Sequence, residues 1–256
     1  MATLTALILA KNEERHISEC VASVAFADEV LVIDDFSTDA TVALAQASGA
    51  RVVTHALNGD WSQQRNFAIG EATGDWILFV DADERISPPL ADEIRKVVHS
   101  GDMKAYELCR YNVFRHNKAV HGSLRPDRVL RLMPKKGLVV EGNVHETIKS
   151  PYPHSRLHGK MYHYTYESWD QYFTKFNRYT TLAAVKYKEQ GKSCSFFRDI
   201  LVRPAWAFFK IYILQKGFLD GKIGFVLSMN HYFYTLTKYA KLYWLLKDGG
   251  ELCFSA

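Results

Sequence analysis

The first hundred residues alternate short apolar runs with stretches in which apolar residues recur at helical spacing. Short apolar runs bounded by polar residues or glycine are typical of buried strands, and the stretches between them predict helices. The expected strands are residues 4–10, 29–35, 51–54 and 76–80, and the expected helices are residues 12–24, 40–48 and 62–71. This alternation predicts right-handed βαβ units, a mainly parallel central sheet flanked by helices, and ligand sites outside the carboxyl ends of the strands.

The pattern changes after the first hundred residues. Shorter strand-like pieces run from 105 to 132, and a loop-rich region follows at 142–148. Ser168 stands three residues before Gln171, the spacing of a capping box, and aromatic residues then recur at helical spacing until Gly191. We therefore expect an aromatic helix that begins after Ser168.

Charged and aromatic residues are unevenly divided along the chain. Residues 1–152 contain 17 Lys and Arg and 21 Asp and Glu, whereas residues 153–256 contain 15 and 7, which together give the net charge of +4. The second part also holds 24 of the 34 Phe, Tyr and Trp residues. We therefore expect an α/β ligand-binding domain at 1–160 and a basic, aromatic helical region at 161–256.

Composition disfavours several protein classes. No RNA- or DNA-binding motif accompanies the basic region, so we expect no nucleic-acid partner. The four cysteines lie far apart without a C-x-x-C spacing, which argues against a zinc site and a disulfide scaffold. The amino terminus enters a strand almost at once, without a secretion signal. The longest uncharged run, 223–237, is shorter than the roughly 20 apolar residues of a spanning helix. A cytoplasmic protein that contacts a membrane fits these observations best.

Two carboxylates close the last of the four expected strands. Asp81 and Asp83 are separated only by Ala82, and alternate strand residues point to the same face, so both carboxylates should face one side. Mg²⁺ and Mn²⁺ prefer such oxygen ligands, and they commonly take one or two protein carboxylates and complete their coordination with water and phosphate. The pair predicts half of a metal-diphosphate site, although a solvated acidic turn would give the same short motif.

Two further acidic segments follow neighbouring strands. Residues 12–14 come after the first strand and residues 34–35 after the second, so that with 81–83 three acidic segments should meet at one edge of the sheet. Asp34 and Asp39 are expected to cap helices. The remaining carboxylates predict a shared crevice for a nucleotide and its cation.

The order of these segments resembles family 2 glycosyltransferases of the GT-A fold. In that family an Asn-Glu turn, an Asp-Asp-x-Ser-x-Asp segment and a strand ending in Asp-x-Asp recur, and the matching residues here are 7–14, 32–41, 64–66 and 74–83. Within this match Asn66 is expected to serve only in a turn or in packing. The resemblance implies a Rossmann-like GT-A domain that binds a nucleotide sugar.

The resemblance also implies roles for individual residues. Asp35 would accept a hydrogen bond from the base, most simply uracil. The backbone around Ala10 and the side chain of Glu13 would line the nucleoside. Asp81 would meet the ribose or the sugar, and Asp83 would bind Mg²⁺ or Mn²⁺.

Glycosyl transfer further requires stabilisation of the leaving diphosphate and a base for the acceptor hydroxyl. Arg65 is expected either to meet the diphosphate or to hold the acidic pair. In such folds the second half of the domain normally supplies this base, and the best candidate segment here is 141–146. Glu146 is our candidate base, and this choice implies a single displacement with inversion. His145 is the candidate third metal ligand, and His163 competes for that role.

A narrower resemblance spans nearly the whole chain. The segments that carry it, which look like those of the bacterial lipopolysaccharide-core β-glycosyltransferase branch, are 128–132, 144–146, 163–164, 177–179 and 217–221. It implies transfer of glucose from a UDP-sugar to a lipid-anchored saccharide such as the lipopolysaccharide inner core. The chain lacks the Gln-x-x-Arg-Trp motif of processive members, which favours transfer of a single sugar.

Three alternatives remain open at the level of sequence. Transfer to a polyprenyl phosphate would use the same donor site, and a catalytically silent nucleotide-sugar scaffold would keep the carboxylates without a working base. A nucleotidyltransferase is disfavoured, because residues 11–14 are acidic where such enzymes carry a glycine-rich basic loop.

The aromatic tail, residues 196–246, alternates apolar runs with single Arg or Lys residues. This pattern predicts amphipathic helices that lie in the headgroup layer of an anionic membrane, which places the protein peripherally on the inner face of the cytoplasmic membrane. A second hydrophobic core or an oligomer interface would also account for these aromatics.

Overall fold

The computed structural model describes residues 1–114, 120–142, 147–166 and 168–247. The chain forms two compact units. Unit 1 contains residues 1–111 and 127–163, and unit 2 contains residues 112–126 and the chain from 164 onward. The segment 112–126, which joins two strands, therefore groups with the helical unit, a division that the sequence pattern did not anticipate.

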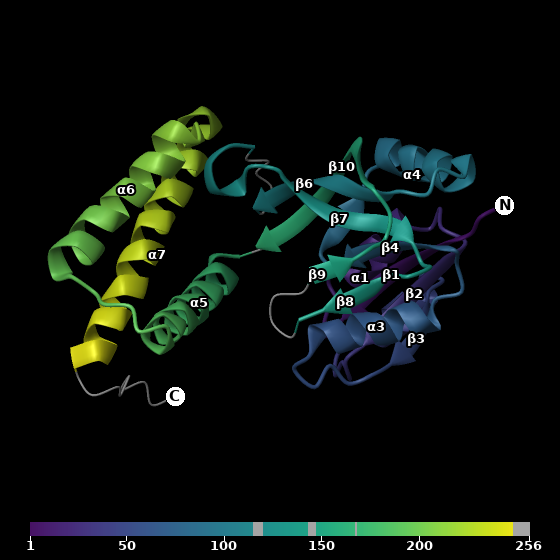
Figure 1. The fold of residues 1–256 in the computed structure, drawn as a ribbon, viewed down its shortest axis with the longest axis horizontal. Coiled ribbons are helices and arrows are strands. Elements are labelled where there is room, and N and C mark those ends of the chain that lie inside the picture. The colour runs from purple at the N-terminus through teal and green to yellow at the C-terminus, as the bar shows by residue number, and fades with distance from the viewer. Residues whose placement is uncertain (115–119, 143–146, 167, 248–256) are drawn as a thin grey trace. The chain divides into compact units, whose positions relative to one another are not determined.

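Eight strands form one sheet in the order β3-β2-β1-β4-β7-β6-β10-β5 (Figure 1). Their bounds are β1 Leu4–Ala10, β2 Glu29–Asp34, β3 Arg51–Thr54, β4 Trp76–Asp81, β5 Glu84–Ile86, β6 Ala105–Phe114, β7 Asp127–Pro134 and β10 His154–Tyr166. The first four strands of the chain are parallel neighbours, as their spacing predicts. The later strands add antiparallel pairs, β4 with β7, β6 with β7 and β5 with β10. The predicted α/β class with a Rossmann-like sheet is confirmed.

Helices cover both faces of the parallel strands. The helices of unit 1 are α1 Ile17–Ser23, α2 Thr41–Ala47, α3 Trp61–Glu71 and α4 Pro88–Ser100. Along β1 the side chains alternate, so that Ile8 packs in one core cluster and Leu7 in the other. A strand buried on both faces is apolar at most successive positions, which explains why β1 is an apolar run interrupted only by Thr5 and β4 is apolar until Asp81.

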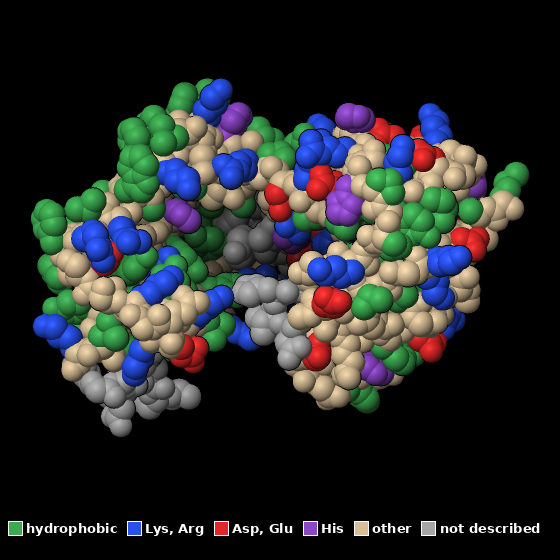
Figure 2. Space-filling view, viewed as in Figure 1, with side chains coloured by type: hydrophobic (Ala, Val, Ile, Leu, Met, Phe, Trp, Pro, Cys, Tyr) green, Lys and Arg blue, Asp and Glu red, His purple; other side chains and the backbone are tan. Residues whose placement is uncertain are grey.

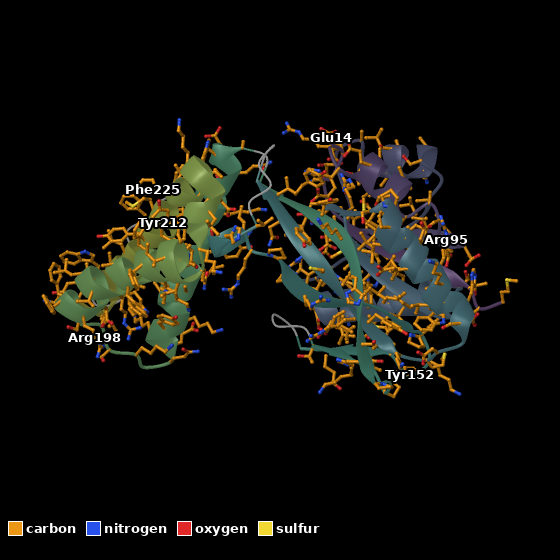
Figure 3. The ribbon with its side chains drawn as sticks, turned by 90° about the horizontal axis from the view of Figure 1, so that it is seen from above. Glu14, Arg95, Tyr152, Arg198, Tyr212 and Phe225 are labelled. Carbon is orange, nitrogen blue, oxygen red and sulfur yellow. The ribbon has the colours of Figure 1, made fainter. Side chains whose placement is uncertain are left out.

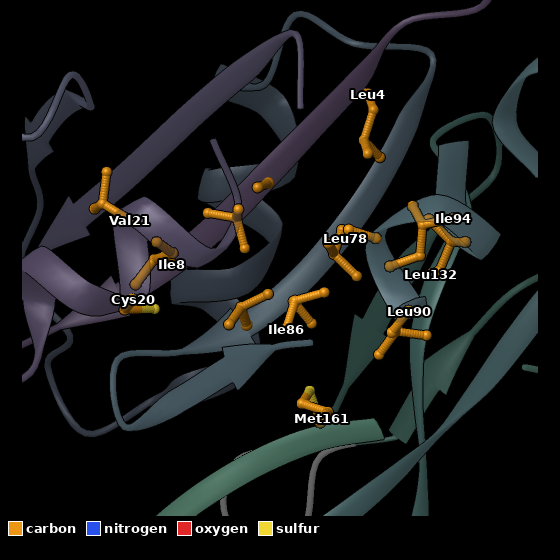
Figure 4. Packing of buried hydrophobic residues seen from close by; sticks show 14 of the residues in the cluster. Leu4, Ile8, Cys20, Val21, Leu78, Ile86, Leu90, Ile94, Leu132 and Met161 are labelled. Carbon is orange, nitrogen blue, oxygen red and sulfur yellow. The ribbon is translucent and has the colours of Figure 1, made fainter. Parts of the chain in front are cut away.

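The larger core cluster joins α1 and α4 to the sheet. Leu90 and Ile94 of α4 pack beside Leu78 and Leu132 of the sheet (Figure 4). Gly159 of β10 permits this close packing, because a Cβ atom there would lie 2.5 Å from the Cα atom of Leu90. Any larger residue at 159 would push α4 away from the strand.

A small second sheet pairs β8 (Val139–Glu141) with β9 (Thr147–Lys149) in antiparallel register. Asn66 of α3 fixes its position: its side chain donates to the Val140 carbonyl at 2.8 Å and accepts from the Val140 N–H at 2.9 Å. These contacts give Asn66 a structural role, as expected.

Unit 2 is helical. Its elements are η1 Gly122–Leu124, α5 Trp169–Glu189, the π-helical η2 Phe196–Val202, α6 Arg203–Phe209, the π-helical η3 Lys210–Leu214, η4 Gly217–Asp220 and α7 Gly221–Lys247. Ser168 caps α5 by accepting from the Gln171 N–H at 3.1 Å, at the predicted position. Aromatic rings join the helices, as where Tyr212 and Phe225 meet edge-on with centroids 5.7 Å apart (Figure 3).

Lys241 links α7 to α5 inside unit 2. Its ammonium donates to the side chains of Asn177, Thr180 and Thr181 at 2.7–2.9 Å. Over the described residues, no helix combines the length and apolar character that a membrane crossing requires.

Candidate active site

The carboxyl ends of β1, β2 and β4 align at one edge of the sheet. Ala10 is in register with Asp34 on one side of β1, and Leu9 is in register with Asp81 on the other. With strands about 4.8 Å apart, the ends of β2 and β4 are separated by about 10 Å across β1. The three acidic segments therefore meet at one edge, which is the arrangement that a shared ligand crevice requires.

Asp35 directly follows β2 at this edge. Its backbone N–H donates to the Ala10 carbonyl at 2.9 Å. Its carboxylate accepts from the Leu57 N–H at 3.0 Å and from the Lys11 ammonium at 2.7 Å. Partial burial opposes ionisation, but these two donors outweigh it and hold the pKa of Asp35 below its usual range. Asp35 is thus a fixed anion whose oxygens keep lone pairs for another donor.

The turns beside Asp35 are held by neighbouring carboxylates. Asp34 is buried and accepts from the Ser37 N–H at 3.0 Å, so it closes a turn after the strand. Asp39 accepts from the Thr41 N–H at 3.0 Å at the start of α2. The contact of Asp39 agrees with the capping role expected for it, whereas Asp34 closes a turn and does not cap a helix. The backbone of Glu13 is tied to the same place, because its N–H donates to the Thr41 hydroxyl at 2.7 Å.

Asp81, at the end of β4, lies between two arginines. Arg131 of β7 forms a short ion pair with it, and the Nη2 atom of Arg65 lies 3.4 Å from its Oδ1 atom. Arg131 also donates to the fully buried Glu84 at 2.8 Å. Of the two roles expected for Arg65, holding the acidic pair requires a contact with Asp81, and this contact is present. A contact with the diphosphate stays a prediction.

Burial and charge act in opposite directions on this cluster. Desolvation disfavours the Asp81 anion, but the charges of Arg131 and Arg65 hold its pKa well below the usual range. Burial raises the pKa of Glu84, and the neighbouring Asp81 anion adds to that effect. Desolvation lowers the pKa of Arg131, but the negative charges of Asp81 and Glu84 outweigh this effect and raise the pKa above its usual range. Arg131 therefore stays positively charged between the buried Glu84 and the partly exposed Asp81.

Sequence reasoning missed Glu84, Arg85 and Arg131. Arg85 is buried and donates to the carbonyls of Ala82 and Glu84 at 2.8 Å, so it shapes the turn that carries the carboxylates. One signal was available: Arg131 lies in the apolar part of β7, between Leu130 and Leu132, and a charged residue that is buried among apolar ones must have a partner.

Asp83 lies beside His163 of β10, with 3.3 Å between its Oδ2 atom and the Nε2 atom of the imidazole. A carboxylate oxygen and an imidazole nitrogen are both accepted ligands of Mn²⁺, and the carboxylate also suits Mg²⁺. Among described residues, no cluster of three His, Cys, Asp or Glu side chains could hold a metal by itself. This donor set fits a cation that takes its remaining ligands from water and a diphosphate.

The candidate base Glu146 and candidate ligand His145 lie outside the described residues. The strands that flank them, β8 and β9, are described, and α3 holds β8 through Asn66. The roles of both residues therefore stay predictions.

Comparisons with known proteins agree with this architecture. The model of the family "Glycosyl transferase family 2" matches residues 5–150. An uncharacterized glycosyltransferase of Rickettsia felis is 32% identical over 94% of this chain and 90% of its own length. The lipopolysaccharide core biosynthesis glycosyltransferase LpsC of Rhizobium meliloti is 27% identical over 94% of this chain and 92% of its own length.

Among solved structures, glucosyl-3-phosphoglycerate synthase from Mycobacterium tuberculosis, in complex with Mn²⁺, UDP and phosphoglyceric acid, covers 46% of this chain and 45% of its own. The identity is 22% and the TM-score is 0.35. The family match covers more than half of the chain and includes each strand whose end carries a candidate carboxylate. The chain belongs to glycosyl transferase family 2.

Proposed function

We propose that this protein is a metal-dependent inverting glycosyltransferase that moves one sugar, most simply glucose, from a UDP-sugar to a lipid-anchored saccharide. The observation that carries the proposal is the alignment of Asp35, Asp81 and Asp83 at one edge of the sheet, with His163 beside Asp83. The similarity to LpsC supports the lipopolysaccharide inner core as the class of acceptor.

The donor would lie across the ends of β1, β2 and β4. Asp35 is held as an anion by Leu57 and Lys11, and it accepts the imide N–H of the base. Ala10 and Glu13 line the nucleoside from the end of β1, and Asp81 faces the ribose or sugar. Because Arg65 and Arg131 already fix Asp81, its position does not depend on the donor.

Asp83, with His163 or His145, would hold Mg²⁺ or Mn²⁺. When bound, this cation neutralises the diphosphate and stabilises it as a leaving group. Arg65 lies beside Asp81, with its guanidinium 5.1 Å from the centre of the Phe79 ring, and adds positive charge at the same edge. Glu146 is proposed to take the proton of the acceptor hydroxyl as that oxygen attacks the anomeric carbon.

Unit 2 would place the enzyme on the membrane that holds the acceptor. Within the continuous helical segment 196–214, four exposed apolar residues recur at intervals of four, three and four, so they share one face. We name this face the exposed stripe; its residues are Val202, Trp206, Phe209 and Ile213. Arg203 and Lys210 are exposed on the same segment. Apolar and basic side chains together suit an anionic membrane surface.

Figure 2 shows hydrophobic side chains with Lys and Arg among them on the surface of the helical unit. The two acidic residues between Phe196 and Lys222 are both engaged: Asp199 pairs with Arg198 at 2.9 Å, and Asp220 with His121 at 2.9 Å. The positive charges of this segment therefore outnumber the negative ones, five to two. This balance favours binding to anionic lipid over assembly with another copy of the same basic surface.

Hydrolysis of a panel of UDP-sugars with Mn²⁺, followed by transfer to deacylated and intact lipopolysaccharide core, tests the reaction. We expect Glu146→Gln to abolish transfer while UDP still binds, because only the base is lost. Wild-type turnover retained in Glu146→Gln would overturn the assignment of the base. Product found only with polyprenyl phosphate would replace the saccharide acceptor.

A further inference from the structure

Unit 2 contains a pocket of about 300 Å³ that the donor site does not use. Its lining combines two tyrosines, a histidine, an amide, a hydroxyl and two leucines, from three parts of the chain. The lining residues are Asn112, Ser123, Leu124, Tyr172, Leu227, His231 and Tyr234. The volume lies at the lower end of the roughly 300–1,000 Å³ found for small-molecule sites.

The part of the pocket wall formed by Ser123 and Leu124 is held in place by Asp220. The buried Asp220 carboxylate accepts from the N–H groups of Val120 and His121, at 3.3 and 2.9 Å. The Nδ1 atom of His121 lies 2.9 Å from the same carboxylate. The motif 217–221, which the donor site does not use, therefore anchors the segment that carries Ser123 and Leu124.

Glycines in and near this motif allow the backbone of residues 217–221 to pack closely against Gly122 and against α7. A Cβ atom on Gly224 would lie 1.9 Å from the Gly217 carbonyl, and one on Gly122 would lie 3.3 Å from the Cα atom of Gly217. Gly122 also has a φ of +57°, a conformation that favours glycine. The wall is thus fixed by close backbone packing as well as by Asp220.

The pocket carries no formal charge. No Lys, Arg, Asp or Glu is among its described lining residues. Burial lowers the pKa of His231, and the charges of Lys238 and Lys210 lower it further, so the imidazole is neutral at neutral pH. A phosphate group would find no cation on this lining to pair with, which disfavours a nucleotide or a lipid phosphate.

The polar groups also disfavour an acyl chain. The Asn112 amide, the Ser123 hydroxyl, the His231 ring and the phenols of Tyr172 and Tyr234 offer several donors and acceptors at once. A hydrocarbon chain offers no hydrogen-bonding partner to such groups. The rings of His231 and Tyr234, nearly parallel at 11°, give apolar faces beside these groups. A sugar ring matches both features, because it has apolar C–H faces and a rim of hydroxyl groups.

We infer that this pocket binds a neutral sugar ring of the acceptor saccharide. That the sugar belongs to the acceptor rests on the proposed function. That the pocket binds a sugar rests on the pocket itself. It assigns a binding role to Asn112, Ser123, Tyr172, His231 and Tyr234, and a positioning role to Asp220.

The test is a titration of the whole protein, labelled with ¹³C in its leucine methyl groups, with methyl glucoside and a methyl heptoside. We expect saturable shifts of the Leu124 and Leu227 signals. Tyr234→Phe removes only one hydroxyl and should weaken binding about tenfold, as expected for the loss of one hydrogen bond. Tyr232→Phe, a neighbour on α7 that does not line the pocket, should leave binding unchanged. Leu227→Trp should fill the pocket and abolish the shift of Leu124.

Three results would overturn the inference. They are the absence of saturable shifts with both sugars, equal effects of Tyr234→Phe and Tyr232→Phe, and shifts produced by dodecanol but not by the sugars. A parallel titration with UDP separates this inference from the proposed reaction. UDP binding without sugar binding would reject the pocket and keep the donor site, whereas sugar binding without UDP binding would keep the pocket and reject glycosyl transfer.

Discussion

The two units differ in the feature on which the role proposed for each depends. In unit 1 charged side chains are buried and paired, as Arg131 is between Asp81 and Glu84. In unit 2 large apolar side chains are exposed, as Trp206 is with 57% of its surface accessible. Buried charge that is fully paired fixes a site in advance of its ligand. Exposed apolar surface beside basic residues instead indicates a surface that becomes covered by a partner.

The largest effect should come from removing the central cation of unit 1. Arg131→Met would leave the buried Glu84 and the partly exposed Asp81 without the guanidinium that they share. Loss of one partner from a buried pair costs about 3–5 kcal/mol, so the free energy of unfolding, measured by chemical denaturation, should fall by that amount. Arg128→Met, on the exposed part of the same strand, is the control and should cost less than about 1 kcal/mol. Equal losses of stability in the two variants would contradict the claim that the pairing of Arg131 with Glu84 and Asp81 stabilises the fold.

Acid should weaken unit 1 through Glu29. Burial opposes ionisation, but hydrogen bonds from Thr5, Thr73 and Arg51 lower the pKa of Glu29 from 4.5 to about 2. Because the folded pKa is the lower one, this stabilisation is complete above pH 4.5 and is lost as the pH falls towards 2. A difference of this size corresponds to about 3 kcal/mol.

Glu29→Gln should therefore reduce stability at pH 7 and flatten its dependence on pH between 4.5 and 2. Asp92→Asn, which changes an exposed carboxylate on α4, should leave that dependence unaltered. A pH profile of Glu29→Gln that runs parallel to the wild-type profile would contradict this assignment.

The exposed stripe of unit 2 should control binding to membranes. Trp206→Ala combined with Phe209→Ala removes two large apolar side chains, and we expect at least a tenfold loss of partition onto anionic vesicles, since burial of each contributes about 1.5–3 kcal/mol. Vesicle flotation measures the partition, and Trp61→Ala in unit 1 is the matched control, because Trp61 is also exposed. Wild-type protein that stays unbound but sediments as a dimer would assign the stripe to an oligomer interface.

The basic residues should have a smaller effect that depends on lipid charge. Lys210→Gln with Lys216→Gln should weaken partition by about 1 kcal/mol per residue on vesicles that contain phosphatidylserine. On neutral vesicles, or in high salt, the variant and the wild type should coincide. A loss that is independent of lipid charge would point to a structural defect.

More of the structure of unit 1 than of unit 2 could be predicted from the sequence. The parallel strands of unit 1 could be predicted because burial on both faces makes β1 and β4 nearly continuous apolar runs. The carboxylates at the strand ends could be located because parallel strands finish at a common edge. The pairing of Arg131 could not be predicted, since its partners Glu84 and Asp81 lie 47 and 50 residues away in the chain.

Unit 2 was less predictable. The cap at Ser168 follows from local spacing, and the structure has it. The grouping of residues 112–126 with the helices depends on the contact of Asp220 with His121, 99 residues apart. No local pattern encodes such a pairing, so the pocket that it builds could be found only from the structure.

The most direct test of the central claim is an equilibrium titration of UDP into the whole protein with Mn²⁺ present. The account predicts one site per chain, with binding at least tenfold weaker after EDTA treatment and similarly weak in Asp83→Asn. Asp92→Asn should bind as the wild type does. UDP binding that is indifferent to both EDTA and Asp83→Asn, or no UDP binding at all, would contradict a metal-diphosphate site at the carboxyl edge of the sheet.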